Sequence, residues 1–120
     1  MNIFTAELIG TALLLLLGNG VVASCALKNT HASGSGWIVI TAAWGFAVFT
    51  GVTVAGPVSG AHLNPAVTLG LAMIGKTPWE LLPTYFAGEM LGGMLGAFLV
   101  WVYFRDQFNS TEDEAPKKAA

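Results

Sequence analysis

The chain is poor in charge: only 10% of its 120 residues are Asp, Glu, Lys or Arg, against roughly 25% in an average soluble domain. Hydrophobic residues make up 54% of the sequence, and 15 residues are glycine. This combination suits closely packed transmembrane helices better than a soluble core. The net charge is -2 and no basic cluster exists, so nothing indicates a nucleic-acid partner.

Metal-ligating and nucleophilic side chains are equally scarce. Cys25 is the only cysteine, which excludes an internal disulfide and any cysteine-based metal cluster. His31 and His62 lack the spacing of metal ligands on one helix, and no nucleophile, base and orienting group can be assembled around them. The sequence therefore predicts no metal, no cofactor and no enzymatic activity.

Three apolar segments are long enough to cross a bilayer: about 4–27, 37–55 and 83–104, each close to the ~20 residues that a span needs. The first segment begins without Lys or Arg, so we expect a retained span rather than a cleaved signal peptide. Residues 105–120 are polar and carry too little apolar surface to fold alone. We expect a membrane domain over 1–104 and a disordered tail over 105–120.

A fourth apolar run, inside residues 56–75, is too short to cross. Asn64 suits the N-cap of a helix and Pro65 suits its first position. The run from Pro65 to Ile74 spans about 15 Å as a helix, or half of a hydrocarbon core about 30 Å thick. Its free N–H groups and positive dipole end should face something polar near the midplane, as in half-helices that line water-filled paths. The predicted fold is an all-α membrane protein with three transmembrane helices and one re-entrant half-helix.

Small residues recur every fourth position on the third span, at Gly88, Gly92 and Gly96. This spacing lets helix backbones approach one another in a membrane. It predicts close helix packing, whether or not the bundle also surrounds a pore.

The residues Ser-Gly-Ala-His-Leu-Asn-Pro-Ala-Val-Thr, from Ser59 to Thr68, resemble the first pore signature of the major intrinsic proteins, the aquaporins and glycerol facilitators. Ala6, Glu7, Gly10 and Thr11 look like the opening helix of that family. The resemblance covers about residues 4–104. It implies one repeat of an inverted-repeat bundle, equivalent to the N-terminal half of an aquaglyceroporin.

The resemblance also assigns roles to individual residues. Trp44 resembles the wide apolar wall of the glycerol-conducting branch; the less favoured alternative is an aromatic residue that faces lipid or packs between helices. Asn64 would donate its amide to a passing hydroxyl, and extended backbone carbonyls would accept hydroxyl hydrogens. Pro65 and Ala66 would complete the structural motif. The backbone carbonyls that would accept hydroxyl hydrogens are those of Gly60, Ala61, His62 and Leu63.

Two acidic residues lie within the apolar spans. By resemblance Glu7 would brace the pore loop through backbone N–H groups. Glu89 stands where many relatives carry Gln, which could mean a neutral, protonated carboxylic acid. The alternative for both is that they reach to the membrane interface.

The function implied is a passive channel in the cell membrane for glycerol and other small uncharged polyols, with water. A complete family member is about twice as long and has a second Asn-Pro-Ala segment followed by an Arg, whereas this sequence has one motif, with Val67 at the equivalent position. The chain would therefore need a second half-channel, either a separate chain or a second copy in the opposite orientation. Complete pores would form homotetramers in the lipid bilayer. The alternatives are a non-conducting truncated fragment, or a small proton-coupled exporter that uses Glu7.

Overall fold

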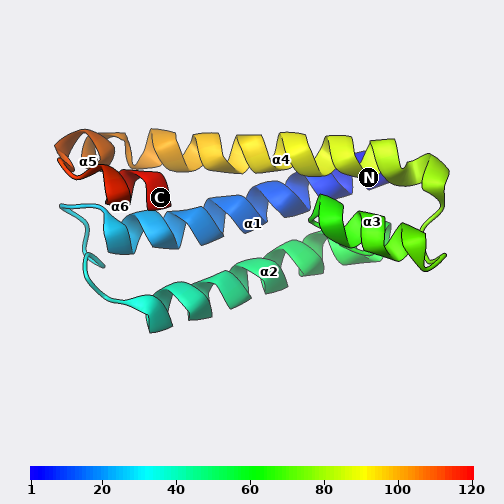
Figure 1. Cartoon of the computed structure of the whole chain (residues 1–120), viewed down its shortest axis with the longest axis horizontal. Helices are drawn as coiled ribbons and strands as arrows, with labels where there is room; N and C mark the ends of the chain where they lie inside the picture. The colour runs from blue at the N-terminus through cyan, green and yellow to red at the C-terminus, as the bar shows by residue number, and fades with distance from the viewer.

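The computed structural model describes all 120 residues, and every regular element in it is helical. Three long helices lie side by side (Figure 1): α1 (Ile3–Ala26), α2 (Trp37–Ser59) and α4 (Leu82–Tyr103), the last preceded by the short 3-10 helix η1 (Trp79–Leu81). Each is long and apolar enough to cross a membrane. The prediction of three spanning helices is confirmed.

The re-entrant helix α3 (Pro65–Met73) has nine residues, or about 14 Å at 1.5 Å per residue. In Figure 1 it runs beside one end of the bundle only. It ends one residue before the expected Ile74. Helix α2 extends four residues past the expected end, includes Pro57, and stops at Gly60, which adopts φ 83 and donates its N–H to the carbonyl of Gly56. The left-handed conformation of a glycine, and not the proline, terminates this helix.

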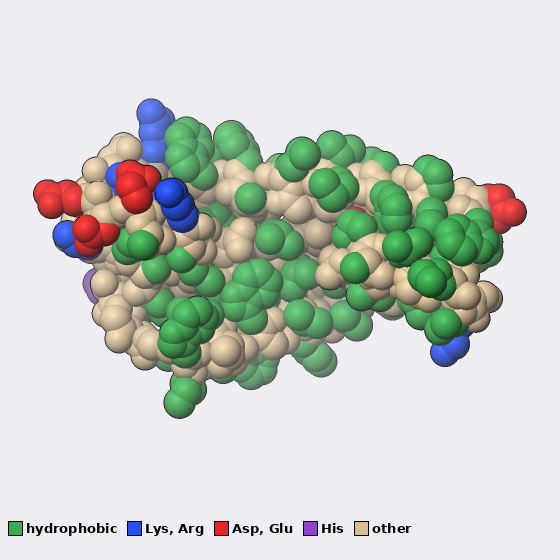
Figure 2. All heavy atoms as spheres, viewed as in Figure 1, with side chains coloured by type: hydrophobic (Ala, Val, Ile, Leu, Met, Phe, Trp, Pro, Cys, Tyr) green, Lys and Arg blue, Asp and Glu red, His purple; other side chains and the backbone are tan.

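Charged side chains gather at the two ends of the molecule, and hydrophobic side chains cover the middle (Figure 2). Phe46, Phe49 and Phe98 are among the many large apolar residues left exposed. Such a belt would be unfavourable in water but is well solvated by lipid tails.

Helix α1 packs closely on α4 through the predicted glycines. A Cβ on Gly88, Gly92 or Gly96 would lie 2.7 Å, 2.3 Å or 2.5 Å from a carbonyl oxygen of α1. The three carbonyls belong to Phe4, Leu8 and Ala12. Successive turns of the two helices therefore meet backbone to backbone, which only glycine permits.

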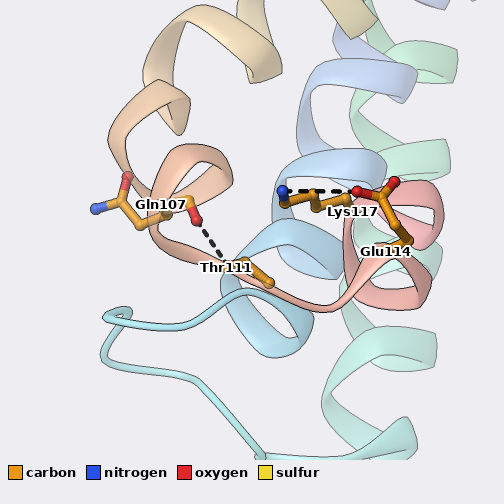
Figure 3. Close-up of polar contacts among 4 residues, drawn as sticks. All are labelled: Gln107, Thr111, Glu114 and Lys117. Atoms are coloured by element: carbon orange, nitrogen blue, oxygen red, sulfur yellow. Dashed lines mark hydrogen bonds and ion pairs between the residues drawn. The ribbon is translucent and has the colours of Figure 1, made fainter.

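Residues 105–120, for which composition predicts disorder, form two short helices, α5 (Arg105–Ser110) and α6 (Glu114–Ala119). Thr111 between them donates to the carbonyl of Gln107 at 2.7 Å (Figure 3) and accepts the Lys28 N–H at 3.1 Å. Phe108 and Ala120 pack on the buried cluster around Leu27. Docking against the end of α1 supplies the apolar contacts that the segment lacks by itself, so tertiary packing outweighs composition. Lys117 pairs with Glu114 at 3.8 Å (Figure 3).

The α1–α4 contact predicts an asymmetry between two adjacent glycines. Gly92→Ala places a methyl group against the Leu8 carbonyl and should cost about 1–3 kcal/mol of unfolding free energy through overpacking. Gly93→Ala meets only Thr11 Cγ2, at 3.9 Å, and should be neutral or slightly stabilising because alanine favours helix. Denaturant unfolding in lipid–detergent micelles, followed by circular dichroism, measures both. Equal stability of the two variants would contradict the packing described.

Candidate functional site

The candidate site is the segment that links α2 to α3. After Gly60, both Ala61 (φ 54) and Leu63 (φ 57) adopt the left-handed region. This conformation is unfavourable for residues that carry a Cβ, and it persists only where the surroundings enforce it. The backbone here must therefore be held by contacts from outside the segment.

The carboxylate of Glu7, on α1, supplies those contacts. Its Oε1 accepts the His62 N–H at 3.0 Å, and its Oε2 accepts the Leu63 N–H at 2.7 Å. The residue is completely buried. Hydrogen bonds to an ionised acceptor are shorter and stronger than those between neutral groups. One side chain thus fixes two consecutive peptide units in the strained conformation.

Ser59 and Tyr85 complete the support. The Ser59 hydroxyl donates to Glu7 Oε1 at 2.6 Å and accepts the Ala61 N–H at 3.1 Å. The Tyr85 hydroxyl, from α4, donates to the Ser59 carbonyl at 2.6 Å. Three successive N–H groups of the segment are therefore paired with side chains of α1 and of the end of α2.

The carbonyls of the same segment, unlike its N–H groups, have no hydrogen-bond partner in the protein. No protein group donates to the carbonyl oxygens of Gly60, Ala61, His62 or Leu63. A peptide carbonyl is an obligatory hydrogen-bonding group, and a run of unpaired ones inside a membrane occurs where a polar path is available. One edge of the segment is held by protein, and the carbonyl edge accepts no hydrogen bond from protein.

Asn64 lies where this segment meets α3. Its Oδ1 accepts the Ala66 N–H at 2.9 Å, and its carbonyl accepts the Thr68 N–H at 3.1 Å. Its side-chain NH₂ donates to no protein acceptor, and the residue is exposed. The capping bond fixes the side chain so that the NH₂ group remains available as a donor.

A groove of about 450 Å³ opens beside Asn64, lined also by Trp44 and Leu63. The indole of Trp44 lies over Gly18 of α1, where a Cβ would meet its ring at 2.4 Å. The Leu63 side chain is buried against Gly10 and Gly51, with its methyl carbons 2.6 Å and 2.9 Å from where their Cβ atoms would be. Leu63 thus anchors the segment between α1 and α2 by its side chain, while its carbonyl stays free.

His62 and Glu89 meet through Thr68 on α3. The Thr68 hydroxyl donates to Glu89 Oε1 at 2.6 Å and lies 2.9 Å from His62 Nδ1. The His62 ring stacks on Tyr85 with centroids 4.1 Å apart. Glu89 is 2% exposed, so it binds α3 and does not reach to the interface. His31 is exposed and lies apart from the site.

Sequence reasoning assigned no role to Ser59, Thr68 and Tyr85, which together hold the segment. The first two stand inside the ten-residue motif, and a hydroxyl beside a helix end is a signal for capping. Nothing in the sequence marks Tyr85, because its partner is 26 residues away.

The family model described as Major intrinsic protein matches residues 1–119. A "Probable glycerol uptake facilitator protein" of Thermotoga maritima is 47% identical over 119 residues, which are 99% of this chain and 51% of that protein. A "Glycerol uptake facilitator protein" of Streptococcus pneumoniae is 48% identical over 113 residues, 94% of this chain and 48% of that protein. This chain therefore spans about half the length of these curated relatives.

A solved structure shares the fold. The X-ray structure of the aquaglyceroporin from Plasmodium falciparum superposes with a TM-score of 0.84 and 36% sequence identity. The match covers 94% of this chain and 46% of that one. The three spans and the half-helix thus form an arrangement already seen in half of a larger channel.

The brace at Glu7 can be tested by its isosteric amide. Glu7→Gln leaves one acceptor oxygen for three donors, and a buried unsatisfied donor costs about 1–3 kcal/mol. We expect faster hydrogen exchange at the His62 and Leu63 amides, measured by mass spectrometry in lipid nanodiscs. Glu80→Gln, at an exposed position in η1, is the matched control and should leave this exchange unchanged. Unaltered protection in Glu7→Gln would show that the segment is held by other contacts.

Proposed function

The chain belongs to the major intrinsic protein family, and on that premise we propose that it forms one half of a passive transmembrane pore for glycerol and other small uncharged polyols, with water. The chain is a multi-pass integral membrane protein of the cell membrane. The observation that carries the proposal is the re-entrant segment: a strained backbone, held on one edge by Glu7, with its carbonyls and the side-chain NH₂ of Asn64 unpaired within the protein.

Conduction would use these groups in sequence. The carbonyls of residues 60–63 accept hydroxyl hydrogens one after another, and Asn64 donates to a hydroxyl oxygen near the middle of the bilayer. Trp44, which shares the groove with Asn64, faces the C–H edge of the solute. Each step replaces part of the solute's hydration without binding tightly enough to stop it, which is what conduction requires.

Charge selectivity would come from α3. A helix N-terminus carries a partial positive charge, and that of α3 is capped by the neutral Asn64 and not by a carboxylate. The resulting field repels cations at the point where the solute loses most of its water. Transport would be passive, because the proposed path only exchanges hydrogen bonds and contains no step that needs an energy source.

The length of the chain, compared with that of its relatives, determines what a complete pore would require. The chain corresponds to about half of its relatives, so the wall opposite Asn64 would come from a second half-channel, either another segment or another copy. By family resemblance, complete pores would associate as homotetramers. The large apolar residues exposed on α2 and α4 offer surface both for such contacts and for lipid.

No observation in the structure favours the alternative function suggested by the sequence, a proton-coupled exporter. An exchangeable carboxylate must release its partners during each cycle, whereas both oxygens of Glu7 are occupied in holding the segment. A non-conducting fragment remains the outcome to be distinguished by experiment.

Stopped-flow light scattering of proteoliposomes under glycerol and water gradients tests conduction. The chain is reconstituted alone and together with the second half of a family relative. We expect glycerol permeability above that of empty liposomes, independent of a proton gradient. Permeability at the empty-liposome level in both reconstitutions would identify a non-conducting fragment, and dependence on a proton gradient would favour an exporter.

Asn64→Ala should lower the glycerol permeability of whichever reconstitution conducts. The variant removes the central donor and also a helix cap worth about 1 kcal/mol, so its folding is checked by circular dichroism. Asn109→Ala, at an exposed position of α5, is the control and should conduct like the parent chain. Full permeability in a folded Asn64→Ala protein would remove Asn64 from the proposed path.

A further inference from the structure

The helical bundle buries two carboxyl groups, those of Glu7 and Glu89, which are 0% and 2% exposed. Neither is paired with a cation, because the one salt bridge of the structure joins Lys117 to Glu114. An ionised carboxylate in an apolar interior needs several hydrogen-bond donors to offset the loss of its hydration. The number of donors around each group therefore indicates whether it carries a charge.

The two carboxyl groups differ in their donors. Glu7 accepts three hydrogen bonds, from one hydroxyl and two backbone N–H groups, which are shared between its two oxygens. Glu89 has a single partner, the Thr68 hydroxyl, 2.6 Å from Oε1. Its Oε2 is buried and has no hydrogen-bond partner. The surroundings thus suit an ion at Glu7 and a neutral group at Glu89.

The negative charge of Glu7 adds to this difference. A Cβ on Gly88, the residue before Glu89, would lie 3.1 Å from Glu7 Cβ. His62 contacts Glu7 through its N–H and lies 2.9 Å from the Thr68 hydroxyl through its Nδ1. Its imidazole forms no ion pair with either carboxyl group. A second negative charge in the same small region is unfavourable, so one of two neighbouring carboxyl groups retains its proton.

The position of that proton follows from the surroundings of Thr68. Its Oγ1 lies 2.6 Å from Glu89 Oε1, 2.9 Å from His62 Nδ1 and 3.3 Å from the Asn64 carbonyl oxygen. With Glu89 ionised, the hydroxyl donates to Oε1. With a proton on Oε1, the bond reverses: the acid donates to Thr68, and the hydroxyl donates to the Asn64 carbonyl. No heavy atom has to move, because all of these contacts are already within hydrogen-bonding distance.

The reversed arrangement is the usual one for a helical threonine. Thr41, Thr50 and Thr53 of α2 each donate to the carbonyl four residues earlier, at 2.9 Å, 2.9 Å and 2.7 Å. Reversal also leaves only a neutral carbonyl oxygen, Oε2 of Glu89, without a partner. The ionised arrangement would instead leave part of a negative charge unpaired, which is the costlier defect.

We propose that Glu89 is held as a neutral carboxylic acid that donates its proton to Thr68 and thereby positions the start of α3. An apolar site can keep a carboxylic acid neutral so that it acts as a donor. Thr68 contacts the Asn64 carbonyl through its N–H at 3.1 Å and through its hydroxyl. Glu89 is therefore a positioning residue that acts on Asn64 through Thr68. This role does not depend on the proposed function, because the proton would be held in a chain that does not conduct.

Infrared spectroscopy of the full chain at neutral pH, in dodecyl maltoside micelles that contribute no carbonyl band, tests for the proton. Exposed carboxyl groups are ionised at this pH, so we expect one carboxylic acid band, absent from Glu89→Gln. Glu80→Gln, at an exposed position of η1, is the matched control and should retain the band. A parent chain without the band, or a folded Glu89→Gln chain that keeps it, would overturn the proposal.

A second variant identifies the carboxyl group that gives the band. Thr68→Val removes the hydroxyl bound to Glu89 while the three donors of Glu7 remain, so the band should shift in frequency. Thr53→Val, whose hydroxyl is satisfied within α2, should leave the band in place. An unshifted band in a folded Thr68→Val chain would assign the proton to another carboxyl group and overturn the proposal.

Hydrogen exchange at the Thr68 amide, followed by nuclear magnetic resonance, tests the positioning role. Glu89→Gln keeps a neutral donor in its NH₂ group and should exchange like the parent chain. Glu89→Met keeps the side-chain length without a donor and should exchange severalfold faster. Exchange in Glu89→Gln as fast as in Glu89→Met, or parent-like exchange in both, would overturn the role of the donor. The infrared result holds whether or not Glu89→Met folds.

Discussion

The carboxylate of Glu7 is the constraint on which the site depends. Burying an ionised group in an apolar interior is costly unless several donors surround it. Here the donors are the Ser59 hydroxyl and the N–H groups of His62 and Leu63. Their hydrogen bonds offset the cost of burying the carboxylate, and the same bonds hold the backbone in its strained conformation. Without the carboxylate, the N–H groups would be unpaired, and no contact would hold Ala61 and Leu63 in the left-handed conformation.

Glycine packing sets the position of that carboxylate. Glu7 lies on the face of α1 that meets α4, where a Cβ on Gly88 would be only 3.1 Å from Glu7 Cβ. On its other side α1 meets α2 at Gly51, where a Cβ would lie 2.8 Å from the Gly10 carbonyl. The small residues therefore do more than bring helices together: they bring the charged group within reach of the segment, and Leu63 fills the remaining space between α1 and α2.

Much of this fold could be predicted from the sequence because its determinants are local. Each of its determinants can be identified in a short stretch of sequence: the length of the spans, the start of α3 at Asn64 and Pro65, and the four-residue spacing of the glycines. Helix α2 runs past the expected end near residue 55 because Pro57 does not interrupt it and the left-handed Gly60 terminates it. The tail was expected to be disordered because its composition is polar, and composition does not reveal that it docks on Leu27, a residue far away in the chain. The link from Thr68 to Glu89 was missed for the same reason.

The hydrogen bonds of Ser59 connect it to partners on both sides in the chain, 52 residues earlier at Glu7 and 26 residues later at Tyr85. This has a consequence for biosynthesis. The link between α2 and α3 leaves the ribosome before Tyr85 does, so its last support arrives only when α4 joins α1. The nine-residue helix α3 thus receives its last contacts only after the longer helices that flank it are in place, although it is translated between them.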